Sequence, residues 1–158
     1  MIRIIAVGKL KEGYLREGIK EFEKRIGAFT RFSIIEVPDE MCPQGASDRE
    51  QYLIKEKEGV RILDKINERD YVITLEIKGR KMSSEGFAEY LNRLAVSGHS
   101  DITFVIGGSL GLWDKVSERA DLKLSFSDMT FPHQLMRLIL CEQLYRSFKI
   151  NRNEPYHK

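Results

Sequence analysis

The sequence has few of the features that mark a specialised class of protein. It contains only two cysteines in 158 residues, Cys42 and Cys141, and neither has a Cys or His neighbour at metal-ligand spacing. We therefore expect two separate reduced thiols and no metal site. An excess of positive charge is also missing, because 26 Lys and Arg residues stand against 24 Asp and Glu residues, a net charge of +2. This balance does not by itself indicate a nucleic-acid-binding protein.

Long hydrophobic runs are absent as well. No apolar run approaches the roughly 18 residues that a membrane-spanning helix needs, and the chain opens on a strand pattern rather than a signal peptide. The sequence therefore predicts a cytoplasmic protein with no membrane partner. Its length and its hydrophobic content of 42% suit one core. We expect a single domain over residues 1–158, without repeats or linkers.

Strand and helix patterns alternate along the chain. Apolar and β-rich runs predict strands at residues 2–7, 32–37, 71–77, 102–106 and 122–126. Helical spacing and capping patterns predict helices at about 15–26, 47–66, 84–94 and 114–119, and a closing helix with Pro132 in its first turn. Ser83 or Ser84 is expected to cap the third of these. The alternation is typical of an α/β domain with a mainly parallel sheet covered by helices on both faces.

The closing helix is apolar over much of its circumference. Its expected core face comprises Leu135, Leu138, Cys141 or Ile139, Tyr145 and Phe148, and Leu140 and Leu144 widen the apolar surface. A helix that is apolar on so many sides needs packing partners on two of them. We therefore expect one side to pack on the sheet and the other on the same helix of a second copy, in a symmetric homodimer.

Three segments are expected at the carboxyl ends of parallel strands, where α/β sheets bind ligands: residues 75–79, 107–111 and 125–132. The Gly-Gly-x-x-Gly order in the second differs from the G-x-G-x-x-G of dinucleotide sites and lacks the P-loop lysine. Two plainer interpretations stay open, a tight turn for the glycines and a helix cap at Ser127, Asp128 or Thr130. His133 is interpreted as a structural hydrogen-bonding residue, because the positive end of a helix disfavours imidazolium.

Five strings, in order from end to end of the chain, resemble the RlmH family of ribosomal RNA methyltransferases. They are IAVGKL at residues 5–10, FVIGG at 104–108, LSFSDMTFPHQ at 124–134, EQLYR at 142–146 and PYHK at 155–158. Several separated motifs in the right order are more specific than one glycine pattern. The resemblance implies a SPOUT-type α/β domain with a deep trefoil knot and a cofactor region at roughly residues 71–158. Periodicity alone favours an unknotted Rossmann-like sheet, because threaded connections are nearly absent among folds.

The resemblance also implies an activity and its cofactor. The family acts as an obligate homodimer that transfers a methyl group from S-adenosylmethionine to N3 of a pseudouridine in 23S ribosomal RNA, on the assembled ribosome. Carried over by position, the S-adenosylmethionine site comprises Leu75, Gly107, Phe126, Ser127, Asp128, Met129, Thr130 and Phe131. Apolar side chains suit a neutral adenine, and glycine permits close approach of backbone to ligand. Such a site needs neither a metal nor a phosphate cradle.

The carboxyl-terminal tail supplies the catalytic candidates. Tyr156 offers a stacking surface and His157 a titratable group, and the resemblance implies that the tail completes a composite site with the partner subunit. Glu142 and Arg146 on the closing helix are further candidates. The plainer interpretations are a frayed terminus for the tail and a surface ion pair for Glu142 and Arg146, which stand at i, i+4 spacing.

Two other classes of function stay open. A non-catalytic ribosome-binding factor would not bind S-adenosylmethionine, whereas a nucleotide-dependent oxidoreductase with a Rossmann-like sheet would bind a dinucleotide. For the methyltransferase, the small net charge and the absence of a separate RNA-binding domain predict weak binding to free RNA.

Overall fold

The computed structural model describes residues 1–158 and contains five strands and five helices. In chain order these are β1 (Ile2–Val7), α1 (Gly13–Gly27), β2 (Phe32–Val37), α2 (Asp48–Lys65), β3 (Tyr71–Lys81), α3 (Ser84–Val96), β4 (Ile102–Ile106), α4 (Asp114–Arg119), β5 (Leu122–Ser125) and α5 (His133–Asn151). None of the helices is both long and apolar enough to cross a membrane.

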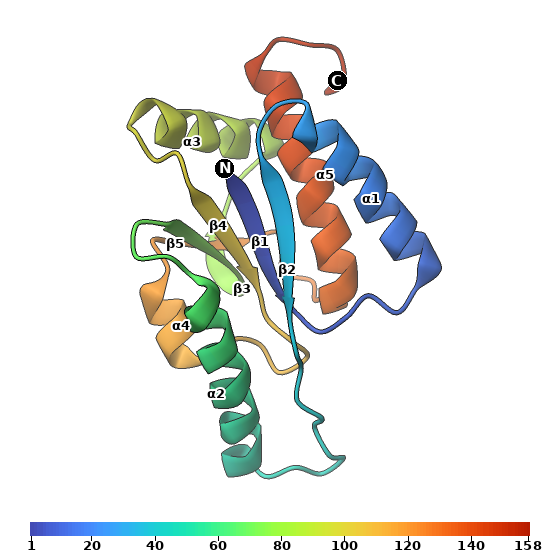
Figure 1. The fold of residues 1–158 in the computed structure, drawn as a ribbon, viewed down its shortest axis with the longest axis vertical. Helices are drawn as coiled ribbons and strands as arrows, with labels where there is room; N and C mark the ends of the chain where they lie inside the picture. Colours follow the sequence, from blue (N-terminus) through green and yellow to red (C-terminus); the bar gives the residue numbers. More distant parts are fainter.

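The strands form one parallel sheet in the order β2-β1-β4-β3-β5 (Figure 1). α1, α3 and α5 pack together on one face, and α2 and α4 cover the other. The predicted α/β class, with a parallel sheet flanked by helices, is therefore confirmed. The trefoil knot, its span and the single-domain assignment stay predictions.

β1 shows why a parallel sheet forms here. Ile2, Ile4 and Ala6 belong to the larger core, beneath α1, α3 and α5, whereas Ile5 and Val7 belong to the smaller core beneath α2 and α4. Alternate side chains thus enter opposite cores, and a strand buried on both faces needs an unbroken apolar run. The same holds for β4, in which all five residues are buried.

The predicted helix starts are largely confirmed. The Ser47 hydroxyl accepts a hydrogen bond from the Glu50 amide at 3.2 Å, and Ser83, rather than Ser84, accepts one from the Gly86 amide at 3.0 Å. Pro132 precedes α5 instead of lying in its first turn. No side chain caps α5, so the open interpretation of residues 127–130 as a helix cap is wrong. The start of α5 therefore keeps free backbone N–H groups.

Two strand ends differ from the prediction. β5 stops at Ser125, one residue early, and β3 continues to Lys81. β3 extends because its pairing with β5 is interrupted and then resumes: both Leu75 and Arg80 have Leu124 as their partner, and residues 76–79 bulge between them. A bulge of this kind redirects side chains at the edge of a sheet.

The predicted core face of α5 is wrong in part. The buried residues of this helix are Arg137, Leu140, Cys141, Leu144 and Ser147, whereas Leu135, Leu138, Ile139, Tyr145 and Phe148 are only half-buried. The face is rotated because Arg137 occupies a core position that an apolar pattern cannot indicate. Its guanidinium is buried and donates hydrogen bonds to Glu36 at 2.8 Å and to the Gly8 carbonyl at 3.1 Å, which compensate for the burial of its charge.

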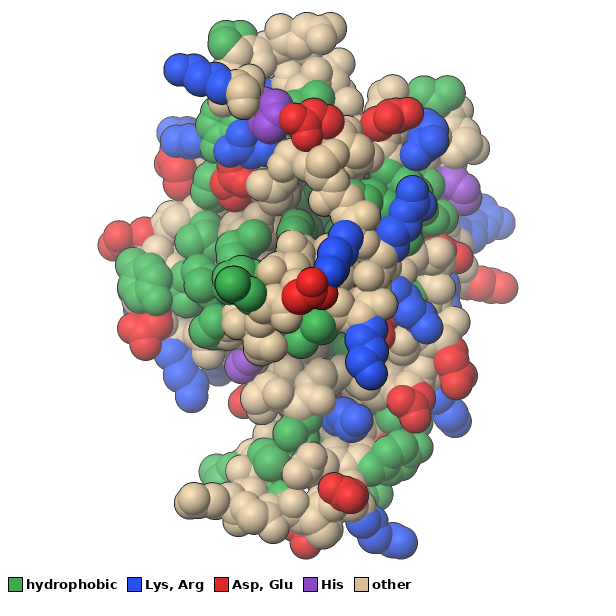
Figure 2. Space-filling view, turned by 180° about the vertical axis from the view of Figure 1, so that it is seen from behind, with side chains coloured by type: hydrophobic (Ala, Val, Ile, Leu, Met, Phe, Trp, Pro, Cys, Tyr) green, Lys and Arg blue, Asp and Glu red, His purple; other side chains and the backbone are tan.

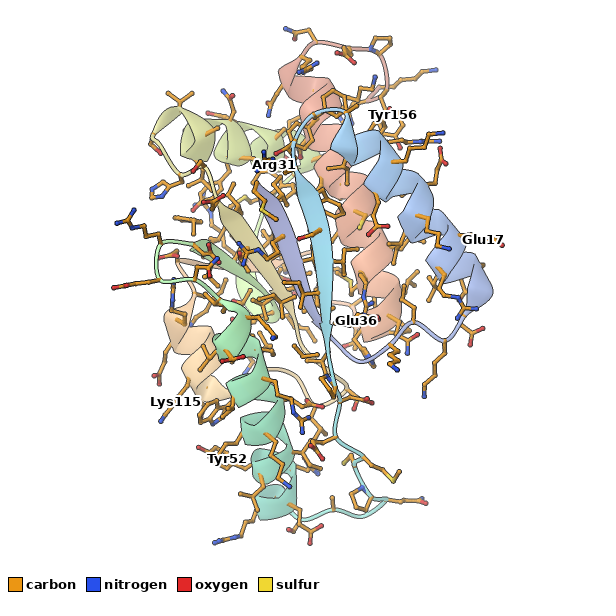
Figure 3. All side chains as sticks on the ribbon, viewed as in Figure 1. Glu17, Arg31, Glu36, Tyr52, Lys115 and Tyr156 are labelled. Carbon is orange, nitrogen blue, oxygen red and sulfur yellow. The ribbon has the colours of Figure 1, made fainter.

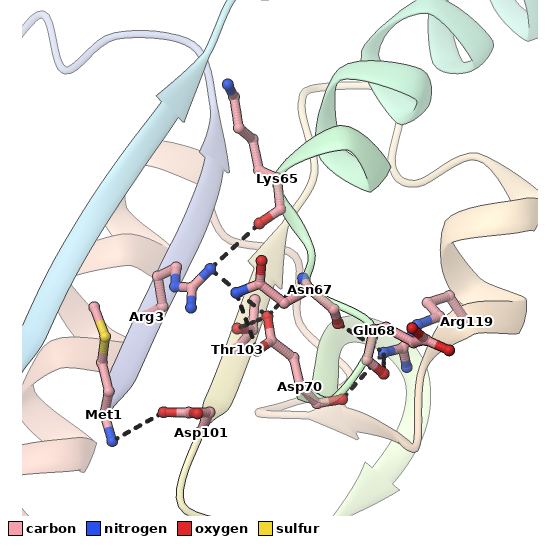
Figure 4. Close-up of polar contacts among 9 residues, drawn as sticks. All are labelled: Met1, Arg3, Lys65, Asn67, Glu68, Asp70, Asp101, Thr103 and Arg119. Carbon is pink, nitrogen blue, oxygen red and sulfur yellow. Dashed lines mark hydrogen bonds and ion pairs between the residues drawn. The ribbon is translucent and has the colours of Figure 1, made fainter.

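A polar network joins the strands at the amino end of the sheet (Figure 4). The buried carboxylate of Asp70 accepts hydrogen bonds from the Asn67 amide at 3.0 Å and the Thr103 hydroxyl at 2.9 Å. Arg3 lies 3.7 Å from the same carboxylate, and Arg119 donates to the Asp70 carbonyl at 3.1 Å. These partners satisfy the buried charge. They also hold the end of the sheet opposite the candidate site described next.

Candidate functional site

A cavity of about 610 Å³ opens at the carboxyl end of the sheet. We call it the large cavity. It is lined by residues 75–77 at the bulge of β3, residues 106–112 at the end of β4 and in the β4–α4 loop, the end of β5 with the following segment (124–127 and 129–132), and His133 and Met136 of α5. The three segments expected at the ligand-binding edge therefore all contribute to one cavity. The adjacent strands β3 and β4 lead to α3 and α4, which lie on opposite faces of the sheet, and such switch points commonly bind ligands.

The glycines of the β4–α4 loop make a tight turn. The Gly111 amide donates to the Gly108 carbonyl at 3.1 Å, and Gly111 has a φ of +88°. At Gly107, a Cβ atom would stand 2.9 Å from Cδ2 of Leu112 and 3.0 Å from the carbonyl carbon of Gly111. The loop itself therefore requires glycine at 107, and the space left by the missing side chain is filled by the protein, not kept for a ligand. Backbone of this loop still lines the cavity.

Glu76 is the one Asp, Glu, Lys or Arg residue that lines the large cavity. It is the first residue of the bulge in β3. The Thr74 hydroxyl donates to its carboxylate at 2.6 Å, and the Ser117 hydroxyl of α4 donates at 2.8 Å. These two donors fix the position of the carboxylate, which places one localised negative charge in the lining of the cavity.

His133 is the other titratable residue of the large cavity. Burial, followed by the positive charge of nearby Arg137, lowers the pKa of its imidazole below the usual value, so the ring is neutral at pH 7. The ring makes no hydrogen bond within the chain, so its interpretation as a structural hydrogen-bonding residue is wrong. A neutral His133 leaves the negative charge of Glu76 without a compensating cation in the lining.

Seven of the eight predicted cofactor residues line the large cavity. The exception is Asp128, whose side chain is 82% exposed and forms an ion pair with Lys81 at 2.5 Å. Asp128 turns outward because β3 continues to Lys81 and brings that cation beside it. Sequence reasoning missed Glu76 and Met136. The position of Glu76 directly after Leu75 was the available signal, whereas nothing in the local sequence singles out Met136.

The four catalytic candidates form one cluster, which we call the tail cluster: Glu142, Arg146, Tyr156 and His157. The Tyr156 hydroxyl donates to Glu142 at 3.1 Å, and Arg146 donates to the same carboxylate oxygen at 2.6 Å. Arg146 also lies 3.0 Å from Nδ1 of His157 and stacks over the Tyr156 ring. Burial, then the charge of Glu142, raises the pKa of Tyr156. The tail is therefore folded against α5, and the alternative of a frayed end is not what the structure shows.

Glu85, a residue of α3, contacts the tail cluster, and this contact was not predicted from the sequence. Its carboxylate lies 2.6 Å from Nε2 of His157. Because Arg146 can only donate, Nδ1 of His157 accepts its hydrogen bond, and Nε2 donates to Glu85. The contact joins residues 72 positions apart, so no local pattern could have indicated it.

The tail cluster and the large cavity lie at opposite ends of α5 in one chain. Met136 is the last residue of α5 that lines the cavity, and Glu142 follows it six residues later, about 9 Å along the helix axis. Figure 3 shows the same separation. Tyr156 lies near one end of α5, and Glu36, which pairs with Arg137 in the first turns of α5, lies near the other. The tail cluster therefore does not reach the cavity of its own chain.

Comparison with known proteins identifies the family. A sequence model described as "Predicted SPOUT methyltransferase" matches residues 1–157. The chain belongs to the SPOUT methyltransferase family. Proteins named Ribosomal RNA large subunit methyltransferase H from Bacillus thuringiensis subsp. konkukian (strain 97-27) and Bacillus cereus (strain B4264) are each 57% identical over 157 residues, 99% of this chain and of theirs. The resemblance found in the sequence strings is thereby confirmed.

A solved structure supports the SPOUT fold independently. The structure of a probable methylase family protein from Haemophilus influenzae Rd KW20 matches with a TM-score of 0.55 and 14% sequence identity, over 99% of this chain and 70% of that one. At so low an identity the match bears on the fold alone. It agrees with the parallel sheet and helix layers described above.

Proposed function

We propose that this protein transfers a methyl group from S-adenosylmethionine to N3 of a pseudouridine in large-subunit ribosomal RNA, as a cytoplasmic homodimer acting on the assembled ribosome. The observation that carries this proposal is the composition of the large cavity, which is apolar apart from small polar groups, the His133 imidazole and one carboxylate. Membership of the SPOUT methyltransferase family and the names of the 57% identical relatives support it.

The residues of the large cavity fit S-adenosylmethionine. When bound, this cofactor supplies a methyl group activated by a positively charged sulfur. Leu75, Phe126 and Phe131 would provide apolar walls for its neutral adenine, and backbone groups of the β4–α4 loop would provide donors and acceptors. The Glu76 carboxylate matches the positive charge of the ligand. Residues 75–77 and 124–132 would exclude water from it.

The same composition argues against a dinucleotide. A dinucleotide brings a pyrophosphate with two negative charges, which binding sites meet with a glycine-rich helix start and, in many cases, cations. The large cavity contributes a carboxylate and neither Lys nor Arg. A non-catalytic ribosome-binding factor, in turn, has no need of a cavity of about 610 Å³. The methyltransferase is therefore favoured over both alternatives.

One ridge of α5 is suited to pairing with a second copy of the chain. Leu135, Ile139, Glu142 and Arg146 recur at helical spacing on the side opposite the buried residues, between the flanking helices α1 and α3. Seen from behind, hydrophobic side chains gather on the side of the molecule where α5 lies (Figure 2). A half-buried ridge that is apolar at Leu135 and Ile139 and charged at Glu142 and Arg146 would be stabilised by a symmetric partner.

Antiparallel pairing of two such ridges would unite the separated parts of the site. If the helices cross near Ile139, residue 135 of one chain stands opposite residues 142–143 of the other. The tail cluster of one subunit then lies beside the large cavity of its partner. The dimer is in this view a requirement of the chemistry, because within one chain Met136 of the large cavity and Glu142 of the tail cluster are about 9 Å apart along α5, and the tail lies farther still along the helix.

The tail cluster would position the target base and receive its proton. Tyr156 offers an aromatic face for stacking, and Arg146 offers a cation that stabilises charge on the base as the imide proton leaves N3. His157, held by Glu85 at Nε2, would accept the proton at Nδ1 once the substrate displaces the hydrogen bond from Arg146. Correct placement of the nitrogen in line with the methyl group supplies a large part of the rate.

A radiolabelled methyl-transfer assay tests the proposal. Assembled ribosomes, free subunits and naked RNA from cells lacking the modification are incubated with the enzyme and labelled S-adenosylmethionine, and the modified base is mapped. We expect labelling of one pseudouridine, strongest on ribosomes. Calorimetry that detects a dinucleotide but no S-adenosylmethionine would instead establish the oxidoreductase alternative. Sedimentation of a monomer at micromolar concentration would contradict the dimer.

A further inference from the structure

A second cavity, of about 300 Å³, lies between α1, β2 and the first turns of α5. We call it the basic cavity. Its lining contains the charged residues Lys9, Arg16, Lys20, Glu23, Glu36 and Arg137. Four cations thus stand against two carboxylates, an excess of two positive charges. The whole chain has a net charge of only +2, so this one small cavity gathers as much excess positive charge as the entire protein carries.

Of the two carboxylates in the basic cavity, Glu36 already has partners within the chain. Glu36 is paired with buried Arg137 at 2.8 Å, and the same oxygen accepts a hydrogen bond from the Leu10 amide at 3.2 Å. This pair is structural, because Arg137 is 1% exposed and also donates to the Gly8 carbonyl. Glu23 is then the one carboxylate left to offset the remaining cations.

The remaining cations of the basic cavity are available to bind an anion. Lys9 and Lys20 are exposed and form no ion pair or hydrogen bond within the chain, although Glu23 lies in the same lining. Arg16 uses one guanidinium nitrogen to donate to the Leu10 and Lys11 carbonyls, at 3.1 and 3.0 Å, and has no carboxylate partner. Three cations without acidic partners therefore converge on one concave site. By contrast, Arg3, Arg61 and Arg119 each have a carboxylate partner.

The basic cavity adjoins the large cavity along α5. Arg137 lies four residues after His133, which lines the large cavity, so the two side chains are one helical turn or about 6 Å apart along the axis. The Lys11 amide donates to the Gln134 side chain at 3.1 Å and fastens the β1–α1 loop to the turn between the two cavities. Figure 3 shows Glu36 on the neighbouring strand β2. The two cavities therefore meet at the first turns of α5, where His133 and Met136 line the large cavity and Arg137 lines the basic cavity.

We propose that the basic cavity binds a backbone phosphate of the RNA strand whose target base enters the large cavity. This inference rests on the proposed function. Lys9, Lys20 and Arg16 would contact the phosphate, and the Arg137–Glu36 pair would form the floor beneath it. A backbone phosphate carries one negative charge, fits a site of this size and is bound by Lys and Arg whatever the base sequence. The contact would position the strand without selecting its sequence.

A double variant tests the proposal. Lys9→Ala/Lys20→Ala removes two exposed cations that make no internal contact, so the fold should be unaffected, whereas Arg16 and Arg137 are left in place because they hold the loop and the core. The matched control is Lys55→Ala/Lys57→Ala on α2, which removes the same charge from the opposite face of the sheet. Binding to ribosomes is measured at a series of salt concentrations, and S-adenosylmethionine binding is measured by calorimetry.

We expect the Lys9→Ala/Lys20→Ala variant to bind ribosomes about tenfold more weakly at moderate salt, with a slope of log affinity against log salt shallower by about one. The control should stay within about twofold of wild type, and both variants should bind S-adenosylmethionine normally. Equal losses in the two variants would show an effect of net charge alone and overturn the proposal. An unchanged salt slope in the Lys9→Ala/Lys20→Ala variant would overturn it as well.

Inorganic phosphate distinguishes an RNA phosphate from a free anion. Phosphate should compete only weakly with ribosomes for the wild-type protein. Tight phosphate binding that is lost in the Lys9→Ala/Lys20→Ala variant, together with unchanged ribosome binding, would make the cavity a site for free phosphate and contradict the proposal. Failure of the proposed function would give a different result, namely wild-type protein that binds ribosomes without methylating them. The two failures can be told apart because the salt dependence of binding is measured independently of methylation.

Discussion

Gly59 of α2 lies against the indole ring of Trp113, so closely that a Cβ atom on Gly59 would stand 2.6 Å from Cε3 of the ring. Trp113 is 6% exposed, and its N–H donates to the Tyr52 hydroxyl at 3.1 Å. A glycine inside a helix normally lowers its stability relative to alanine. Here the close approach of α2 to Trp113, in the smaller core, compensates for that loss.

Gly59→Ala should therefore destabilise the protein, against the usual helical preference. The added methyl group would force Trp113 out of its packed position, which we expect to lower the free energy of unfolding by about 1–3 kcal/mol. Gly27→Ala is the matched control, because Gly27 also lies in a helix and nothing stands within 4 Å of its missing Cβ. It should change stability by less than about 1 kcal/mol, in the favourable direction. Urea denaturation measures the free energy of unfolding of both variants. If this free energy changes in the same direction in both, the explanation is refuted.

The two cysteines should react very differently with thiol reagents. Cys141 is fully buried, and burial raises the pKa of its thiol to about 12. A raised pKa leaves roughly one thiolate in ten thousand at pH 8, and the thiolate is the reactive form. Cys42 lies in the loop before α2 and is partly exposed. Titration with a chromogenic disulfide at pH 8 should detect one thiol in the native protein and two in denaturant. Two fast thiols in the native state would contradict the buried position of Cys141.

The accuracy of sequence-based prediction differed between backbone and side chains. Residues such as Leu75, Gly107 and Phe131 follow strand ends, and parallel topology brings strand ends to one edge, so their convergence was predictable. Arg137 was not, because its burial depends on Glu36, which lies 101 residues away in the chain. The outward position of Asp128 was not predictable for a similar reason, since its partner Lys81 belongs to a part of β3 that exists only beyond a bulge. Long-range pairing of charges leaves no periodic signal.

Glu76→Gln should weaken the binding of S-adenosylmethionine by about tenfold, because it removes the one negative charge of the large cavity and keeps the shape of the side chain. S-adenosylhomocysteine lacks the positive charge on sulfur and should lose much less affinity. Glu89→Gln on α3, an exposed carboxylate, is the control and should bind both ligands normally. Calorimetry of the three proteins measures the effect. An equal loss for both ligands would place Glu76 against a part that they share, such as the ribose.

The last prediction concerns the tail cluster. Removing Tyr156, His157 and Lys158 should reduce methylation of ribosomes by at least about a hundredfold, because a misplaced acceptor base loses the proximity on which transfer depends. Cofactor affinity and sedimentation should be unchanged, since the large cavity and the α5 ridge contain none of the three residues. Stability should change little, because these residues lie outside both hydrophobic cores.

Single substitutions separate the roles within the tail. Tyr156→Phe removes the hydrogen bond to Glu142 at 3.1 Å and keeps an aromatic ring under Arg146, so stacking should survive and turnover should fall only severalfold. His157→Ala removes the group held between Arg146 and Glu85, and it should alter the pH dependence of the rate as well as its size, because only loss of a titrating group changes that profile. An unchanged profile in His157→Ala would remove His157 as the proton acceptor. If the truncated enzyme methylates ribosomes at nearly the wild-type rate, the tail is not part of the active site. The argument that the two subunits must form one shared active site would then fail as well.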